Sequence, residues 1–436
     1  MRGAPLALLA LALVATAGCG GADDRRAPAR EARTTTGTRA APAVEPGARA
    51  LEHLDALLEH TREAGGDRVA STDGERATAA YATAVLREAG LRVRRQPVRF
   101  AFFEERGPAR VTADGRGVGA PGQVRTLAYS ASGSATGPVA VVAFDRADSG
   151  CRRTDFTAVR RGDVVLAGRG VCPFARKVRL AQRAGADAVV VADRRDSDAP
   201  RGTLGRPGIA TVPAVAVGRD AGERLRRARR ASVRVRAVSE QRTSSNVVAD
   251  TPAAERRRRA VMVGAHLDSV ARAPGANDNA SGVAAALAAA EALARDGTAV
   301  RVGLWGAEEL GLHGSRAYVR RIDDARRRQI RAYVNLDMVG SRNGEAAVYG
   351  DRAPRAALRE ALDTRGPAPG RTRMRGGSDH VPFARAGIPV GGIFTGASRR
   401  SDPCYHRACD TGANVDRRLL ARVARATATA LRALAS

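Results

Sequence analysis

The sequence contains few aromatic residues and almost no lysine. Aromatic side chains make up 3% of the 436 residues, and Lys177 is the only lysine behind a formal net charge of +28. Arginine therefore supplies nearly all of the positive charge, and it occurs throughout the chain rather than in one stripe. Nucleic-acid-binding proteins cluster their basic residues and stack bases on aromatic rings. We therefore exclude nucleic acid as a partner and interpret the charge as a compositional bias, compatible with attraction to an anionic cell envelope.

The apolar run at the N-terminus is too short to span a membrane. It extends from Pro5 to Val14 after Arg2 and ends in small residues, which is typical of a signal peptide covering residues 1–18. Small residues directly before Cys19 suggest that this cysteine is acylated, although Thr16 stands where such lipoprotein signals prefer leucine. We therefore expect an exported protein, either an outward-facing lipoprotein held at the cell membrane only by its lipid anchor or a simply secreted protein.

Only five cysteines are present, and setting Cys19 aside leaves Cys151, Cys172, Cys404 and Cys409. An even remainder in an exported chain indicates two disulfides. Of the three possible connectivities, the local pairs Cys151–Cys172 and Cys404–Cys409 are the simplest. Neither pair has the spacing of a zinc ribbon with a second CxxC motif, so structural bridges are favoured over a zinc site.

The chain divides into segments of different composition. Residues 19–48 are rich in Ala, Arg, Pro, Thr and Gly without a hydrophobic period, which indicates a disordered tether. Leucines with helical spacing begin at Leu51. Residues 130–238 contain short β-branched runs, turns and no histidine, which predicts a compact β-rich domain. Because the N-terminal elements must join the C-terminal body, we expect this β-rich segment to be an insertion in a domain formed by residues 49–129 and 239–436.

From Ser244 onward, strand-like and helical patterns alternate, which predicts a parallel or mixed sheet with helices on both faces. The expected strands are 261–264, 300–305, 332–337 and 388–394, and the expected helices are 281–295, 315–330, 355–364 and 415–434. The predicted fold class is α/β, with a mixed, mostly parallel sheet and an inserted β-rich domain. Charged residues follow or end three of these strands, where α/β enzymes place their chemistry.

Candidate ligands follow the first of these strands. His266 follows a buried-looking strand, and Asp268 lies on the same side of an extended chain, where it can orient the imidazole. Asp278 lies in the loop Gly-Ala-Asn-Asp-Asn-Ala-Ser-Gly, just before a predicted helix. Taken alone, His266 could be a surface histidine, and Asp278 could belong to a helix-capping loop.

Carboxylates also accompany the next two strands. Glu308 and Glu309 follow the strand that ends at Trp305. Adjacent glutamates are commonly solvated surface charge, but after a central strand one can bind a metal while the other handles protons. Asp337 ends an apolar strand, where an unpaired charge would be costly.

Near the C-terminus, Tyr405 and His406 lie between Cys404 and Cys409, so a short bridged loop would hold both side chains rigidly. His406 offers a nitrogen ligand, and Tyr405 offers a phenol that can donate to an oxyanion. Two histidines and three carboxylates suffice for two zinc ions if one carboxylate bridges, which leaves one glutamate to move a proton. The other histidines are expected to have no part in the chemistry. His53 and His60 would lie on the surface of the first helix, and His313 would pack or lie on the surface. His380 would have a structural role, although it could lie near the site.

Taken in this order, the motifs resemble those of the secreted dizinc aminopeptidases of the bacterial leucyl aminopeptidase and aminopeptidase Y type. The resemblance extends over nearly the whole chain after the tether and implies the zinc exopeptidase fold. It further implies that Asp278 bridges two Zn²⁺ ions. His266 and Asp337 would complete one metal site, and Glu309 and His406 would complete the other.

The same resemblance implies catalytic roles. Glu308 matches the general base of the family, and Tyr405 matches a tyrosine that stabilises the tetrahedral intermediate. A cis peptide bond between Asp278 and Asn279 is also implied.

The insert resembles a protease-associated domain through the segments 150–156, 169–174 and 184–186. Such inserts are noncatalytic, and the resemblance implies an influence on substrate access.

Motifs and resemblance together predict a monomeric, exported dizinc metallo-aminopeptidase that acts on peptides with a free N-terminus. A carboxypeptidase of the glutamate carboxypeptidase II type is an alternative, but those proteins carry a further helical dimerisation domain, whereas only 30 residues follow His406. A noncatalytic binding protein that retains the fold is an alternative from another class, and its signature would be lost ligands.

Overall fold

The computed structural model describes residues 45–120, 122–364, 366–374 and 377–436. The expected signal peptide, Cys19 and most of the expected tether lie outside the described residues. Helix α1 (Pro46–Glu63) begins within the last residues assigned to the tether. Its start is fixed by Glu45, whose carboxylate accepts hydrogen bonds from the backbone N–H groups of Gly47 and Ala48. None of the helices in the described part has the length and apolar character needed to cross a membrane.

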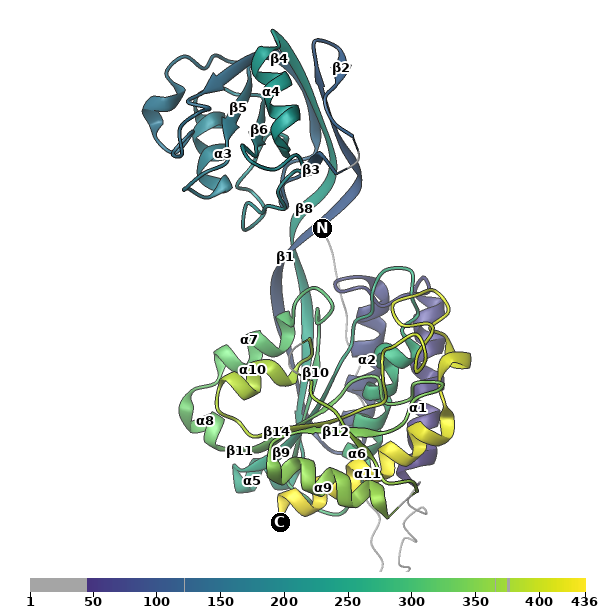
Figure 1. Cartoon of the computed structure of the whole chain (residues 1–436). Helices are drawn as coiled ribbons and strands as arrows, with labels where there is room; N and C mark the ends of the chain where they lie inside the picture. Colours follow the sequence, from purple (N-terminus) through teal and green to yellow (C-terminus); the bar gives the residue numbers. More distant parts are fainter. Residues whose placement is uncertain (1–44, 121, 365, 375–376) are drawn as a thin grey trace, which may run out of the picture. The chain divides into compact units, whose positions relative to one another are not determined.

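A mixed sheet forms the centre of the main body, which is built from α1, α2 and the elements from β8 onward (Figure 1). The strands run in the order β13-β12-β14-β11-β9-β10-β8. Their bounds are β8 (Arg230–Asp250), β9 (Ala260–His266), β10 (Val300–Trp305), β11 (Ile330–Leu336), β12 (Ala347–Gly350), β13 (Gly370–Arg371) and β14 (Val390–Phe394). β10, β9, β11 and β14 pair in parallel, whereas β8 and β12 pair antiparallel with β10 and β14. The predicted mixed, mostly parallel sheet is confirmed.

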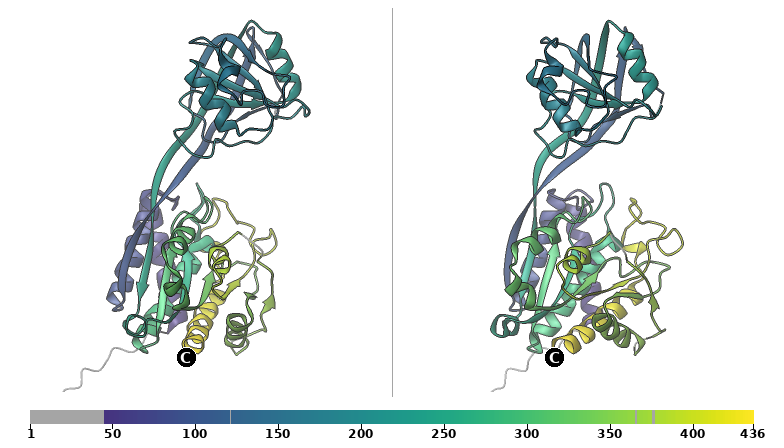
Figure 2. Two further views of the ribbon diagram at one scale, coloured as in Figure 1. Left: turned by 90° about the vertical axis from the view of Figure 1, so that its left-hand side faces the viewer. Right: turned by 60° about the vertical axis from the view of Figure 1, so that its left-hand side comes forward.

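Helices cover both faces of this sheet (Figures 1 and 2). One face packs against α1, α2 (Asp73–Glu88), α6 (Gly282–Arg295), α9 (Arg352–Asp363) and α11 (Arg417–Ala435), which share one hydrophobic cluster with the strands. On the other face, α7 (His313–Arg321) and α10 (His380–Arg385) bring Tyr318 and Phe383 against Trp305 and Tyr333. With both faces covered, the central strands read as continuous apolar runs rather than as alternating patterns.

Two sequence expectations about the main body are wrong. The helix expected at 315–330 is two helices, α7 and α8 (Asp324–Arg328), because Asp323 caps a new helix by accepting a hydrogen bond from the backbone N–H of Arg326. His53 is fully buried rather than on the surface. Its ring nitrogens lie 2.7 Å from the hydroxyl of Tyr81 and 3.2 Å from Oε2 of Glu291, which satisfies both of them.

Further strands lie in the segment expected to be an insert, residues 130–238, or, for β3, just before its expected start. They are β3 (Val124–Thr126), β4 (Gly133–Val142), β5 (Val164–Gly168), β6 (Ala188–Ala192) and β7 (Ala214–Val217), with α3 (Phe174–Arg183) and α4 (Arg219–Arg227). β4, β5, β6 and β7 pair in parallel, and the Cys151–Cys172 disulfide lies in this segment. The chain enters it on β1 (Arg92–Ala113) and returns on β8, and these two long strands pair antiparallel from Arg92 opposite Asp250 to Ala113 opposite Ala231.

Candidate metal centre

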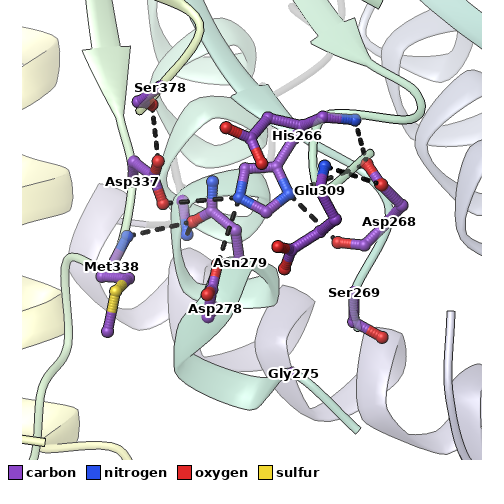
Figure 3. Close-up of polar contacts among 12 residues, drawn as sticks. His266, Asp268, Ser269, Gly275, Asp278, Asn279, Glu309, Asp337, Met338 and Ser378 are labelled. Carbon is purple, nitrogen blue, oxygen red and sulfur yellow. Dashed lines mark hydrogen bonds and ion pairs between the residues drawn. The ribbon is translucent and has the colours of Figure 1, made fainter. Parts of the chain in front are cut away.

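Three of the five candidate ligands, His266, Glu309 and Asp337, lie at or just beyond the carboxyl ends of three adjacent parallel strands. β9 ends at His266, Glu308 and Glu309 follow β10, and Asp337 directly follows β11. Because these strands are neighbours in the order β11-β9-β10, side chains that are far apart in the sequence meet at one edge of the sheet (Figure 3). His266, Glu308 and Asp337 are buried there.

The carboxylate of Asp278 lies between two imidazoles. Its Oδ1 is 3.1 Å from Nε2 of His266, and its Oδ2 is 3.1 Å from Nε2 of His406. Oδ1 of Asp337 lies 3.4 Å from the same nitrogen of His266, and Oε2 of Glu309 lies 3.2 Å from that of His406. The site therefore has two halves, each with a histidine and a second carboxylate, and Asp278 faces both.

The two halves differ in their access to solvent. Asp278 and Asp337 are buried around His266, whose side chain is 2% exposed, whereas the side chain of His406 is 38% exposed. In each half the ligand atoms lie within 4.8 Å of one another, as they also do in a third group formed by His266, Glu308 and Glu309.

The histidines and carboxylates of the site shift one another's pKa values. Burial acts to raise the pKa of Asp278, but hydrogen bonds from His266 and His406 hold that pKa below its usual range. Hydrogen bonds with Asp278 and Glu309 raise the pKa of His406 to about 10. Burial acts to lower the pKa of His266, but the charges of Glu308 and Asp337 raise it well above its usual value. The surrounding negative charge therefore favours a positive charge at both imidazoles, and a bound cation would supply that charge in place of the protons.

The pKa values of the two adjacent glutamates are raised, whereas that of Asp278 is lowered. Burial raises the pKa of Glu308 well above its usual range, and the carboxylates of Asp379 and Asp337 add to this effect against the charge of His266. Burial together with Asp278 raises the pKa of Glu309 to about 7. Carboxyl groups that titrate nearer neutral pH are suited to proton transfer.

Asp268 contacts His266 differently from the expectation. The backbone carbonyl of Asp268 lies 3.1 Å from Nδ1 of His266, whereas its carboxylate is 3.8 Å away. That carboxylate instead accepts hydrogen bonds from the backbone N–H groups of Glu308 and Glu309, at 2.9 and 3.2 Å (Figure 3). Asp268 therefore orients the imidazole through its backbone and positions the two glutamates through its side chain.

The loop that carries Asp278 is fixed from the C-terminal side. Asp410 follows Cys409, which forms a disulfide with Cys404. The carboxylate of Asp410 accepts a hydrogen bond from the backbone N–H of Asn277 at 2.9 Å. The peptide bond between Asp278 and Asn279 is cis, as the resemblance implies. The structure also has both disulfides in the local pairing expected from the sequence.

Sequence reasoning missed Arg68, which is fully buried beside the site. Its guanidinium donates to the backbone carbonyls of Leu267 at 3.0 Å and Gly275 at 2.9 Å, so it ties together the loops that carry His266 and Asp278. Burial lowers the pKa of Arg68, and the carboxylates of Asp410 and Asp278 oppose that effect. A single arginine in the loop between the first two helices forms no recognisable motif, so no sequence signal could have identified it.

Ser378 and Asp379 were also missed as parts of the site. The hydroxyl of Ser378 donates to Oδ2 of Asp337 at 2.5 Å, and burial raises the pKa of Asp379 to about 7. The neighbouring His380 is buried, and its Nε2 lies 3.2 Å from the carbonyl oxygen of Met374. The Ser-Asp-His sequence was the available signal, but only its histidine was considered as a candidate.

A cavity of about 550 Å³ opens over the ligands. Its walls include His266, Asp278, Glu308, Glu309, Asp337, Tyr405 and His406, together with Leu312, Met338, Met374 and Phe394. The ring of Tyr405 lies with its centroid 3.9 Å from that of His406 and is 37% exposed. A substrate entering this cavity would meet carboxylates, a phenol and an apolar wall.

The donor set fits zinc. Imidazole nitrogen and carboxylate oxygen are among the ligands that zinc accepts in proteins. Oε1 of Glu309 is buried, and no residue in the described part of the chain offers it a hydrogen bond. A bound cation would satisfy this oxygen and would lower the raised pKa values of the surrounding carboxyl groups.

The sequence is similar to known proteins over most of its length. Residues 246–431 match peptidase family M28, and residues 135–225 match the PA domain. The probable lipoprotein aminopeptidase LpqL of Mycobacterium tuberculosis is 34% identical over 413 residues, which cover 85% of this chain and 81% of the relative. An aminopeptidase of Pseudomonas aeruginosa is 32% identical over 80% of this chain and 74% of the relative.

Two solved structures are similar over most of the chain. An aminopeptidase from Aneurinibacillus sp. strain AM-1 is 27% identical with a TM-score of 0.60, and the match covers 88% of this chain and 92% of that one. A zinc aminopeptidase from Bacillus subtilis is also 27% identical, with a TM-score of 0.57 and coverages of 88% and 94%.

Proposed function

This chain belongs to peptidase family M28 and carries a PA domain, and we propose that it is an exported dizinc aminopeptidase that removes N-terminal residues from peptides. Residues 130–238 would form the inserted domain, and residues 49–129 and 239–436 would form the catalytic domain.

The observation that carries this proposal is the position of Asp278 between His266 and His406. A carboxylate whose two oxygens face different histidines is suited to bridge two cations. Asp337 would complete the zinc site of His266, and Glu309 would complete that of His406. When bound, the two zinc ions would lower the pKa of a water molecule and polarise the scissile carbonyl group.

We assign the role of general base to Glu308. Its carboxylate is buried beside the candidate ligands, and burial raises its pKa well above the usual range. A carboxylate in this position can accept the proton of the attacking water and then donate it to the leaving amine. Asp268 supports the role because it holds the backbone N–H of Glu308.

Tyr405 would stabilise the developing oxyanion. It lines the same cavity as Glu308, and burial raises the pKa of its phenol above the usual value, so the hydroxyl keeps its proton. A protonated phenol can donate a hydrogen bond to the oxyanion of the tetrahedral intermediate. The carboxylates of the cavity would attract the α-amino group of the substrate, and this attraction would restrict cleavage to the N-terminal residue.

Blocked peptides test which end of the substrate is recognised. One peptide is compared in three forms, free, N-acetylated and C-amidated, with and without a chelator. We expect cleavage of the free and amidated forms, loss of cleavage on acetylation because the α-amine is neutralised, and loss of all cleavage with the chelator. Cleavage of the acetylated form with loss on the amidated form would make the protein a carboxypeptidase. Chelator-sensitive binding of the peptide without cleavage of any form would make it a noncatalytic binding protein.

We also propose that Cys19 carries a lipid that holds the monomeric enzyme at the outer side of the cell membrane. The relative LpqL is named a probable lipoprotein, which supports this assignment. Cys19→Ala should move the activity from the membrane fraction to the medium. Recovery of the unaltered protein in the medium would favour simple secretion, and light scattering would test the monomer.

A further inference from the structure

We propose that Asn246 is a positioning residue for the catalytic step, because its side chain forms hydrogen bonds with the first and the last residue of the loop that carries Glu308. This loop (residues 306–314) is called the glutamate loop below. The inference rests on the role of Glu308 proposed above, and it adds a residue on a different strand through which that role is maintained.

The glutamate loop folds back on itself. The carbonyl oxygen of Glu308 accepts hydrogen bonds from the backbone N–H groups of Gly311 and Leu312, both at 2.8 Å. The carbonyl oxygen of Ala307 accepts from the N–H of His313 at 3.0 Å. The bond between Ala307 and His313 closes the loop one residue inside its ends, Gly306 and Gly314.

Asn246 joins the two ends. It lies on β8, beside the strand from which the glutamate loop emerges, and it is fully buried. Its Oδ1 accepts from the backbone N–H of Gly306 at 3.3 Å, and its Nδ2 donates to the carbonyl oxygen of Gly314 at 3.0 Å. One amide side chain thus bonds the first and the last residue of the loop, and a Cβ on Gly314 would lie 2.4 Å from its Oδ1.

Other residues of the β1–β8 pair pack against the same loop. Ala307 lies in one buried cluster with Phe100 and Phe102 of β1. The ring of His313 stacks on that of Phe100, with centroids 5.3 Å apart. The loop is therefore held against β1 and β8 by apolar contact, and Asn246 adds directional bonds to its first and last residues.

Loss of these bonds should move Glu308 more than the metal ligands. Asp278 and Asp337 lie outside the loop, and Glu309 also contacts His406. The position of the Glu308 carboxylate is set by the loop and by the bond between its N–H and Asp268, and a displacement of about 1 Å can reduce turnover by up to about a hundredfold. Asn246 therefore acts on the rate through Glu308 rather than on metal or substrate binding.

The test compares Asn246→Ala with Ser245→Ala in the full chain at saturating zinc. We expect kcat to fall by about ten- to a hundredfold in Asn246→Ala, with KM within about twofold and zinc content unchanged. Ser245 is the matched control, because it neighbours Asn246 on β8 and, among the described residues, its hydroxyl accepts only from exposed Arg95, at 2.7 Å. Its substitution should leave kcat unchanged, and an equal loss of kcat in both variants would overturn the assignment.

A double variant separates positioning from general damage. If Asn246 acts through Glu308, then Asn246→Ala should lower kcat in the native chain but not further in a Glu308→Gln background. An equal loss in both backgrounds would overturn the role of Asn246 and leave the proposed function intact. Normal turnover of Glu308→Gln alone would instead remove the proposed base, and this inference with it.

A gentler substitution keeps the proposal testable if Asn246→Ala does not fold. Asn246→Asp preserves an acceptor for Gly306 but places a carboxylate oxygen opposite the carbonyl of Gly314. Protonation restores a donor there, so the kcat of this variant relative to the native enzyme should rise as pH falls. A ratio that stays constant or falls with decreasing pH would contradict the proposed bond to Gly314.

Discussion

Asp410 accepts a hydrogen bond from the backbone N–H of Asp278, at 3.1 Å. Asp410 directly follows the disulfide between Cys404 and Cys409, and the same short loop carries His406. One bridged segment therefore supplies a candidate zinc ligand and also holds the backbone of the carboxylate that would bridge both ions.

Opening the Cys404–Cys409 bridge should reduce activity more than opening the Cys151–Cys172 bridge. Replacing Cys404 and Cys409 by serine frees the loop of His406, and we expect kcat to fall by at least about tenfold. Replacing Cys151 and Cys172 by serine should cost stability, about 3 kcal/mol for a loop of this length, but leave kcat within about twofold. Thermal unfolding beside steady-state kinetics checks both. Equal kinetic losses in the two double variants would contradict the bracing role.

Glu308→Gln should slow turnover by at least about a hundredfold while retaining zinc, because the amide has the size of the acid but cannot accept the proton of the attacking water. Metal analysis and kinetics on the same sample decide the point. Loss of zinc in this variant would make Glu308 a ligand, and near-normal turnover would assign the base to another residue. Glu63→Gln, on the C-terminal turn of α1, is the control for the substitution itself.

The residues that the sequence identified share a position that can be read from a pattern. His266, Glu309 and Asp337 are polar residues at the ends of apolar runs, and parallel strands bring such ends together. Arg68 and Asn246 could not be found in this way. Their partners are backbone groups about 200 and 60 residues away in the sequence, and such contacts leave no periodicity or motif.

The two places where the main body differs from the sequence-based expectation have similar causes. His53 is expected on the surface because histidine is polar, but Tyr81 and Glu291 on other helices form hydrogen bonds with both of its ring nitrogens. The break between α7 and α8 depends on a capping aspartate that also fits a helical surface. In both cases a tertiary or capping contact overrides the local pattern.

Removal of zinc should abolish activity and lower the melting temperature, because several carboxylates would then face one another without a cation. His266→Ala and His406→Ala should each reduce the zinc content from two ions toward one, since each histidine serves one half of the site. Atomic absorption after dialysis, with calorimetry of the same samples, measures both effects. A single zinc ion in the unaltered protein would contradict the bridging role of Asp278.

Glu75 should make the folded protein less stable as the pH rises. Burial, with a contribution from Asp268, raises the pKa of Glu75 to about 8, from a usual value of 4.5. Between these values the folded state keeps a proton that the unfolded state has lost. Raising the pH through this window therefore costs stability, on the order of a few kcal/mol by pH 8, and below it the penalty is absent.

Glu75→Gln tests this directly, because glutamine reproduces the protonated acid. One oxygen of Glu75 accepts from the backbone N–H of Ser71 at 2.6 Å, and the other lies 2.5 Å from the hydroxyl of Ser244. An amide can accept from the first group and donate to the second. The melting temperature of the variant should therefore match that of the native protein near pH 5 and exceed it increasingly toward pH 8. Glu75 is not one of the proposed zinc ligands, and both proteins are measured at saturating zinc so that metal loss does not contribute to the difference. A difference that is the same at both pH values would show that Glu75 does not hold its proton in the folded state.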